Sequence, residues 1–503
     1  MRAVVIHALP FLSGFLFWAS FHPLNLGFLA WGALVPLIAY ARRTRGWIPL
    51  GLSWLAGAGA FTAGFFWVRY TVPAGPYLLG LYNGLYFAFF VAIVRRLGAL
   101  WSAAAWTGLE YARGTLFGGL PWFLLGYTQH EALRIVQIAD LGGVWLVSAL
   151  VAFVNAAFVD GRRAARGAAA AALAGAFLYG AARLETLPRE EGPRVAVVQP
   201  NIPQSLKELS TRQAAQALEN YSRHVELTRR VSEEKPDLIL WPEAAIYYGL
   251  EWDAERGRWV RDAWYRRVTS PAVEAGAPTV IGLLVVERGP GREFAFTNSA
   301  VYVDREGGIV GRYDKVHLVP FAEFIPLART FPWIRDLVRR WSGLYLADMR
   351  AGEDFPLWEA AGERFGTQIC FEAIFPGISR AIARKGARFT VNISNDGWFR
   401  DSAELDQMLA MARFRAIENR MHVIRATNTG ISALIEPSGR LQAAVEEGGR
   451  RKEVEGTLAE RIVLTRAGSL FRAVGDMAGI LAAGASLAAL AGRIFVDRKI
   501  RRA

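Results

Sequence analysis

The sequence predicts two kinds of structure in one chain: a polytopic α-helical membrane domain with about eight transmembrane helices, and a layered α/β domain. Seven long apolar stretches precede a more polar middle region, and an eighth follows it. The middle region alternates short β-branched strands with amphipathic helices. Of the 503 residues, 53% are hydrophobic, which excludes a disordered chain and is too apolar for domains that face only water.

The apolar stretches are interpreted as membrane spans because most approach the roughly 20 residues that a helix needs to cross a bilayer core. The first follows Arg2, as a signal peptide would, but six more spans come after it without a convincing cleavage site, so it is expected to be an anchor. The stretches cover residues 4–21, 26–40, 48–68, 77–94, 97–111, 135–159, 168–182 and 473–496. We therefore expect seven transmembrane helices over 1–190, a soluble domain over 191–466, and a C-terminal transmembrane helix with a basic tail over 467–503.

The distribution of charge predicts how the chain is oriented. Lysine and arginine number 58 against 45 aspartate and glutamate, a net charge of +13, and most of the excess lies in the membrane part. This argues against a nucleic-acid-binding surface. By the positive-inside rule, the basic loops place both termini in the cytoplasm and the middle region on the outer face, which is the periplasm in a bacterium. The basic loop residues are Arg42, Arg43, Arg45, Arg95, Arg96, Arg162, Arg163 and Arg166.

The middle region is expected to be an α/β domain whose strands are buried on both faces. Its predicted helices cover 214–233 and 403–421, and the second is expected to begin with a capping box formed by Asp401 and Glu404. A hairpin is predicted over 299–313, with its turn at 304–308. The predicted strands are 194–200, 237–241, 278–286, 365–370 and 389–394.

Three motifs at the ends of predicted strands contain residues suited to acyl chemistry. A thiol that attacks an acyl carbon needs a base for its proton and a cation or amide group for the developing oxyanion. Glu243, Lys315 and Cys370 could supply base, cation and nucleophile. The motifs are Leu240-Trp-Pro-Glu243, Tyr313-Asp-Lys315-Val-His-Leu-Val-Pro320 and Gly366-Thr-Gln-Ile-Cys370-Phe-Glu372.

Each of these residues also has an ordinary structural interpretation. A lone cysteine that ends an apolar strand more often packs as a small hydrophobic residue, and a single glutamate is usually solvated. Lys315 is one of only six lysines in an arginine-rich chain, although chance could place it there. The single cysteine excludes an intramolecular disulfide and a multi-cysteine metal site, and no metal or other cofactor is expected.

Taken together, the motifs resemble the nitrilase (carbon–nitrogen hydrolase) superfamily, and the flanking membrane spans resemble the bacterial apolipoprotein N-acyltransferase family within it. The resemblance covers nearly the whole chain and implies an α-β-β-α sandwich for the middle region. Further segments that match the family are Gly119-Leu-Pro-Trp-Phe-Leu-Leu-Gly-Tyr-Thr-Gln129, Asn201-Ile-Pro-Gln204, Ser394-Asn-Asp-Gly-Trp-Phe399 and Arg425-Ala-Thr-Asn-Thr-Gly430.

The resemblance implies roles for individual residues. Glu243 would be the general base, Lys315 would stabilise the tetrahedral oxyanion and Cys370 would be the nucleophile. Glu323 matches a second family glutamate that supports the site. Three further residues match positions in or near the substrate pocket: Glu372, Trp398 and Phe371, the last of which stands where some members have tyrosine.

The resemblance also implies an activity and its partners. The implied reaction is transfer of a fatty acyl chain from a phospholipid to the α-amino group of a diacylglyceryl-cysteine at the start of an apolipoprotein, through a thioester on the enzyme. The enzyme would be a monomer in the bacterial inner membrane. Its catalytic domain would lie in the periplasm, where apolar segments such as 321–333 and 341–346 either dip into the bilayer or simply pack over the site. Two other functions are weighed: a membrane-anchored amidase or nitrilase with water as acceptor, and a transporter or receptor with a ligand-binding outer domain.

Overall fold

The computed structural model describes residues 2–210, 213–289, 294–328, 330–342 and 348–502. The chain divides into two compact units. Unit 1 contains the chain up to Pro188, the segment Ser402–Arg420 and the chain from Arg466 onward. Unit 2 contains Arg189–Asp401 and Met421–Thr465. The segment Ser402–Arg420 contains a helix that was expected in the soluble domain, whereas it is part of unit 1.

Unit 1 is helical. In its described part, four helices are long and apolar enough to cross a membrane: α5 (Gly75–Leu97), α8 (Ala139–Asp160), α9 (Arg163–Thr186) and α17 (Met477–Arg502). The apolar part of α1 (Arg2–Ala19) is shorter. Several apolar helices are therefore present, and the number of eight spans stays a prediction. The other helices of the unit are α2 (Ala30–Ala33), α3 (Val35–Arg43), α4 (Ile48–Gly64), α6 (Ser102–Thr115), α7 (Leu133–Val136), α15 (Ala403–Asn419) and α16 (Leu470–Val474).

The second apolar stretch, predicted as one span over 26–40, forms two short helices. The helix α2 ends at Ala33, and α3 begins at Val35 with Pro36 in its first turn. Proline is favourable in the first turn of a helix but removes a hydrogen-bond donor from a helix interior. The sequence around Pro36 therefore starts a new helix instead of continuing the old one.

The helix α8 is interrupted near its beginning, where Gly142 and Gly143 leave the helical conformation. Gly143 has a φ of +69°, which a residue with a side chain rarely adopts. The main-chain amide of Val144 donates instead to Oε1 of Glu418 on α15, at 2.9 Å. A carboxylate from a distant part of the sequence thus satisfies an amide at the break.

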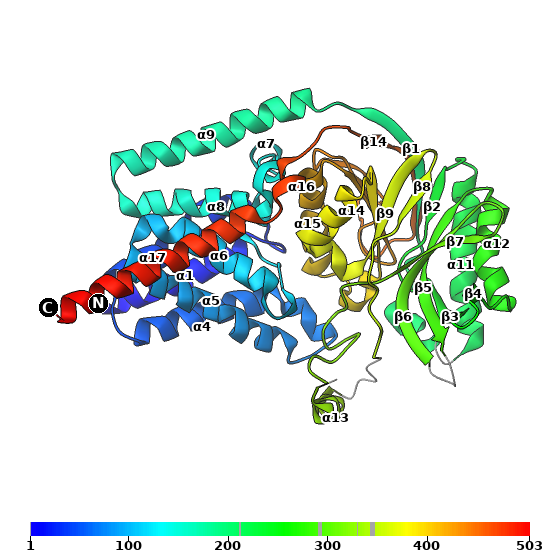
Figure 1. Cartoon of the computed structure of the whole chain (residues 1–503), viewed down its shortest axis with the longest axis horizontal. Coiled ribbons are helices and arrows are strands. Elements are labelled where there is room, and N and C mark those ends of the chain that lie inside the picture. The colour runs from blue at the N-terminus through cyan, green and yellow to red at the C-terminus, as the bar shows by residue number, and fades with distance from the viewer. Residues whose placement is uncertain (1, 211–212, 290–293, 329, 343–347, 503) are drawn as a thin grey trace. The chain divides into compact units, whose positions relative to one another are not determined.

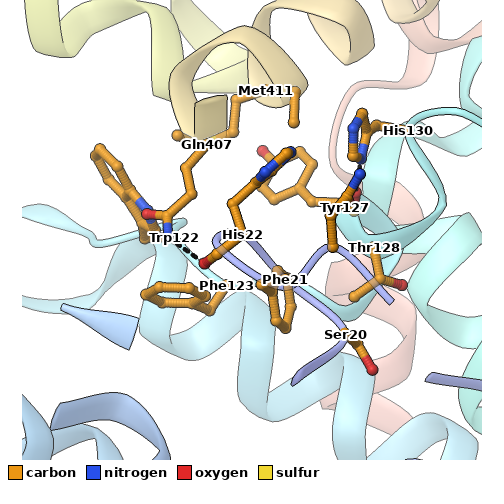
Figure 2. Close-up of a pocket in the computed structure, with 12 residues that line it drawn as sticks. Ser20, Phe21, His22, Trp122, Phe123, Tyr127, Thr128, His130, Gln407 and Met411 are labelled. Atoms are coloured by element: carbon orange, nitrogen blue, oxygen red, sulfur yellow. Dashed lines mark hydrogen bonds between the residues drawn. The ribbon is translucent and has the colours of Figure 1, made fainter. Parts of the chain in front are cut away.

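The helix α15 makes further polar contacts in unit 1. Arg420, directly after it, donates from Nη2 to Oδ2 of Asp140 at 2.6 Å, and both side chains are buried. Gln407 donates to the main-chain oxygen of His22 at 3.0 Å and accepts from the indole of Trp122 at 2.7 Å. His22, Trp122 and Gln407 line a small cavity of about 20 Å³, and Figure 2 shows these three side chains around it. These buried contacts explain why α15 belongs to unit 1.

Unit 2 contains two β-sheets. The first has the strand order β14-β1-β2-β5-β3-β4, with β6 paired to β5 and β7 paired to β6; the second has the order β13-β12-β11-β10-β9-β8. The first sheet comprises β1 (Glu190–Gln199), β2 (Leu238–Leu240), β3 (Ile246–Asp253), β4 (Arg258–Trp259), β5 (Thr279–Arg288), β6 (Phe294–Val303), β7 (Ile309–Asp314) and β14 (Gly456–Leu464). The second comprises β8 (Leu357–Ala360), β9 (Glu363–Ile369), β10 (Phe389–Ser394), β11 (His422–Thr427), β12 (Ala433–Ile435) and β13 (Leu441–Ala444).

The two sheets pack face to face with helices on their outer sides. One core cluster joins Val197 and Leu240 of the first sheet to Phe365 and Val391 of the second. A second cluster packs the outer face of the first sheet against α11 (Ala214–Ser232) and α12 (Ala263–Ala275), and a third packs α14 (Pro376–Arg384) on the second sheet. The predicted α-β-β-α sandwich is thus confirmed, and its layers can be followed in Figure 1. The remaining helices of unit 2 are α10 (Gln204–Ser210) and α13 (Pro332–Ser342).

The strands and helices predicted for the middle region are present, with shifts at their ends. Every predicted strand has a counterpart, and β6 and β7 form the predicted hairpin, whose first strand begins earlier than expected, at Phe294. The predicted cap of α15 is wrong. Ser402 is the N-cap and its hydroxyl accepts from the amide of Glu404, because a serine directly before the first turn reaches that amide better than Asp401 does.

Two buried histidines make the stability of unit 2 dependent on pH. Burial lowers the pKa of His224 and of His422 to about 3, from 6.5. The unfolded chain therefore binds more protons than the folded chain between these values, and stability falls as the pH drops below 6.5. We expect each histidine to lower the free energy of unfolding by about 2 kcal/mol at pH 5 relative to pH 7.

The measurement is a urea titration at the two pH values, followed by tryptophan fluorescence. Trp241, whose ring lies 4.9 Å from that of His224, reports on this region. His224→Gln and His422→Gln should each weaken the pH dependence. A urea midpoint that is equal at pH 5 and pH 7 in the wild-type protein would contradict the prediction.

Candidate active site

Topology brings three distant segments of unit 2 together. Glu243 follows β2, Lys315 follows β7 and Cys370 follows β9. The strands β2 and β5 are parallel, and β7 is antiparallel to β6, which is antiparallel to β5. The strands β2 and β7 therefore run in the same direction and end at the same edge of the first sheet. Cys370 interacts electrostatically with both Glu243 and Lys315, so the structure brings the three residues together.

The carboxylate of Glu243 is buried and receives hydrogen bonds from two directions. Its Oε1 accepts from the side-chain amide of Asn298 at 2.7 Å, and its Oε2 accepts from the main-chain amide of Asn395 at 2.9 Å. The Nζ atom of Lys315 lies 3.6 Å from Oε1. Glu243 itself is only 7% exposed, so these donors replace the water that a surface carboxylate would have.

Lys315 is a buried cation with two carboxylates beside it. Its side chain is 1% exposed, and Nζ donates to Oε1 of Glu323 at 2.9 Å. Burial alone would lower the pKa of Lys315, but Glu323 and Glu243 outweigh it and raise the pKa above its usual value. Lys315 therefore stays protonated over the physiological range and provides a fixed positive charge next to Cys370.

Cys370 lies at the point where β9 ends and a short 3-10 turn (Cys370–Ile374) begins. Its φ of +52° is a left-handed conformation that non-glycine residues rarely adopt and that concentrates at functional sites. Burial and the nearby Glu243 carboxylate raise the pKa of the thiol well above its usual value, although Lys315 acts in the opposite direction. The resting sulfur is therefore protonated and needs a base before it can act as a nucleophile.

Glu323 and Asn298 connect the base and the cation. The amide of Asn298 donates to Oε1 of Glu243 and to Oε1 of Glu323, at 2.7 and 2.8 Å. The second oxygen of Glu323 accepts from the amide of Val319 at 2.8 Å. Asn298 thus binds the carboxylates of Glu323 and Glu243 with one side-chain amide.

Glu372 is completely buried and joins the loop after β7 to the turn at Cys370. Its Oε1 accepts from the amides of Val316 and His317, at 2.8 and 3.0 Å. Its Oε2 accepts from the hydroxyl of Tyr313 and from the amide of Ile369, each at 2.7 Å. With four donors on a carboxylate that has no exposure, Glu372 organises the backbone of the site.

Phe371 and Trp398, the remaining residues predicted for the site, are more accessible. Phe371 is partly buried, and its ring lies 5.9 Å from that of His317 and 5.1 Å from that of Phe375. Trp398, on the 3-10 turn Asp396–Phe399, is 43% exposed. Both rings can contact a molecule that approaches from solvent or from a lipid surface.

Sequence analysis missed two donors to Glu243. Asn298 lies inside β6, where nothing in the strand pattern marks it as functional. Asn395 belongs to the segment 394–399, but it acts through its main-chain amide, which every residue type except proline supplies. Only the buried position of a polar side chain within an apolar strand could have pointed to Asn298.

Comparison with known proteins places the chain in a family. Residues 194–464 match the model described as carbon-nitrogen hydrolase, and residues 13–157 match the model described as apolipoprotein N-acyltransferase N-terminal domain. The first match covers the strands of the α-β-β-α sandwich from β1 to β14. The class is therefore that of a carbon–nitrogen hydrolase superfamily enzyme.

Similar proteins define the family more closely. The apolipoprotein N-acyltransferase of Geobacter metallireducens is 33% identical over 466 residues, which cover 86% of this chain and 85% of the relative. The enzyme of that name from Agrobacterium fabrum is 32% identical and covers 79% and 78%. A solved nitrilase-superfamily member from Saccharomyces cerevisiae is 17% identical, covers 55% of this chain and 91% of its own, and has a TM-score of 0.39. From the two curated relatives and the family models, the chain belongs to the apolipoprotein N-acyltransferase family.

The shared donor Asn298 provides a test of the site geometry. In Asn298→Ala, two neighbouring carboxylate oxygens lose a hydrogen bond in a buried place, so we expect the free energy of unfolding to fall by about 1–3 kcal/mol. Thermal unfolding measures the effect, and a variant as stable as the wild type would contradict the two hydrogen bonds of Asn298.

Proposed function

We propose that the protein transfers a fatty acyl chain from a membrane phospholipid to the α-amino group of an N-terminal diacylglyceryl-cysteine of an apolipoprotein. The name of the similar proteins supports this reaction. The observation that carries the proposal is that the buried Glu243 and Lys315 lie together with the partly buried Cys370 in a chain of this family. No metal or other cofactor enters the scheme, and the protein acts as a monomer.

In the first half-reaction, Cys370 attacks the ester of the phospholipid. Glu243 takes the thiol proton as the sulfur bonds to the carbonyl carbon, which is needed because the resting thiol is protonated. The tetrahedral intermediate then breaks its carbon–oxygen bond, and Glu243 returns the proton to the departing glycerol oxygen. A thioester on Cys370 and a free lysophospholipid result.

In the second half-reaction, the amine of the lipoprotein attacks the thioester. Glu243 accepts a proton from the nitrogen, the carbon–sulfur bond breaks, and the proton passes to the sulfur of Cys370. The amide product leaves and the enzyme returns to its starting state. Because one product leaves before the second substrate reacts, the cycle is a ping-pong mechanism.

Lys315 stabilises the negative charge that forms on the carbonyl oxygen in both half-reactions. A fixed cation in a water-poor site acts strongly on such an oxyanion and needs no rearrangement at the moment of reaction. Glu323, 2.9 Å from Nζ, holds this cation in place without entering the reaction. Glu372 keeps the turn at Cys370 in position, and Phe371 and Trp398 contact the lipid substrates.

Both substrates are anchored in lipid, so the site is expected to open toward a membrane. We place the protein in the bacterial inner membrane with eight spans and with unit 2 in the periplasm. Four large hydrophobic side chains among the described residues of the segment 321–333 are exposed, which suits contact with the outer leaflet. They are Phe321, Leu327, Phe331 and Trp333. Most of the segment 341–346 lies outside the described residues.

The alternative acceptor is water, which would make the protein an amidase or nitrilase held in the membrane. The same three residues serve that reaction, so geometry alone does not separate the two. The two reactions differ in product: N-acylated lipoprotein in the first case and free fatty acid in the second.

The direct test is to incubate the purified protein with phospholipid and to search the Cys370 peptide for an added acyl group by mass spectrometry. We expect the acyl group on wild-type protein and none on Cys370→Ser. Adding a diacylglyceryl-cysteine peptide should remove the acyl group from the enzyme and place it on the peptide amine.

Glu243→Gln should slow acylation by about 100-fold or more, because the amide cannot take the thiol proton. The exposed Glu255 provides the matched control, and Glu255→Gln should behave as wild type. Transfer to the peptide without any acyl group on Cys370 would overturn the thioester mechanism, and release of fatty acid with no peptide product would favour the water-acceptor enzyme.

A further inference from the structure

Lys207 is a buried lysine that the mechanism above does not use. It lies on α10 (Gln204–Ser210) and is 2% exposed. An ammonium group is costly to bury, so its position calls for a partner. Two other lysines of unit 2, Lys235 and Lys385, are exposed, as is usual for this residue type.

The partner of Lys207 is the residue proposed as the general base. Its Nζ donates to the main-chain oxygen of Glu243 at 3.2 Å. The backbone at this point is unusual, because the next residue, Ala244, has a φ of +49°. A left-handed conformation in a non-glycine residue persists only where the surroundings hold it. Lys207 supplies one of these contacts, and the amide of Ala245, which donates to Gly282 at 2.8 Å, supplies another.

The segment that carries Lys207 is fixed to the same end of the sandwich. Asn428 accepts from the amide of Ile202 at 3.0 Å and donates back to its oxygen at 2.8 Å. Gln204 accepts from the side chain of Asn395 at 3.1 Å, and the main-chain amide of Asn395 donates to the carboxylate of Glu243. Two routes therefore join α10 to Glu243, one through Asn395 and one through Lys207.

Two titratable groups face Lys207. The carboxylate of Glu243 raises the pKa of Lys207, and Lys207 in turn lowers the pKa of His224 of α11, which burial keeps neutral. Burial lowers the pKa of Lys207 to about 7, and Glu243 opposes this shift. The positive charge of Lys207 therefore decreases across the neutral range.

We propose that Lys207 is a positioning residue for Glu243: its ammonium holds the main-chain oxygen of Glu243 and thereby keeps the carboxylate oriented toward Cys370. The inference rests on the proposed function, in which Glu243 is the base. In this arrangement α10 belongs to the support of the site, and Lys207 acts only through Glu243.

The test measures the rate of Cys370 acylation in a single turnover, by mass spectrometry, across a range of pH. The full-length protein is mixed with phosphatidylethanolamine in detergent micelles. Lys207→Met should acylate about 100-fold more slowly, since a displacement of a catalytic group by about 1 Å has this effect. Lys207→Arg keeps a cation and should retain most of the rate. The exposed-lysine control Lys235→Met should match wild type.

The pH profile separates positioning from a merely structural role. In wild type, we expect the rate to fall off as Lys207 loses its proton near pH 7. Lys207→Arg stays charged throughout, so this decrease should be absent from its profile. If Lys207→Met does not fold, as judged by thermal unfolding, the profile of Lys207→Arg decides alone, and a profile identical to wild type overturns the inference.

Glu243→Gln distinguishes this inference from the proposed function. If Glu243→Gln acylates as fast as wild type, the proposed role of Glu243 fails. If Glu243→Gln is slow while Lys207→Met is as fast as wild type, the role of Glu243 stands and the inference about Lys207 is overturned.

Discussion

One buried ammonium group, that of Lys315, determines how the rest of the site is built. A charge in the protein interior is stable only when opposite charge and hydrogen bonds replace its lost water. Glu323 and Glu243 provide that charge at 2.9 and 3.6 Å from Nζ. These two carboxylates need further hydrogen-bond donors, and the side-chain amide of Asn298 donates to both of them. The arrangement keeps the cation protonated.

The geometry at Cys370 depends on a third buried carboxylate, that of Glu372. Cys370 has a left-handed backbone conformation, at the point where β9 ends and a turn begins. Glu372, two residues later, accepts four hydrogen bonds: one from Tyr313 of β7, two from the loop that follows Lys315 and one from the end of β9. The cation and the thiol are thus held by one shared group, so that a shift in either segment affects both.

The helical unit obeys the rule that buried or lipid-exposed backbone must keep its hydrogen bonds. Where α8 breaks at Gly142 and Gly143, Glu418 of α15 accepts from the amide of Val144. Arg420 and Asp140 form a buried ion pair at 2.6 Å in the same unit. The helix α15 comes between β10 and β11 in the sequence. The polar contacts described here nevertheless join it, and Arg420 directly after it, to the helices of unit 1.

Periodicity and apolar length were sufficient to predict a layered α/β domain and several apolar helices. The strand-end motifs grouped Glu243, Lys315 and Cys370, and the family resemblance that they carry implied the sandwich. These features are local in sequence or belong to motifs whose order reveals the family. Tertiary structure alone decided that α15 packs in unit 1, and that Asn298, Asn395 and Lys207 support Glu243. Such contacts join residues far apart in the chain through buried hydrogen bonds, and no pattern of neighbouring residues encodes which distant donor will meet a given carboxylate.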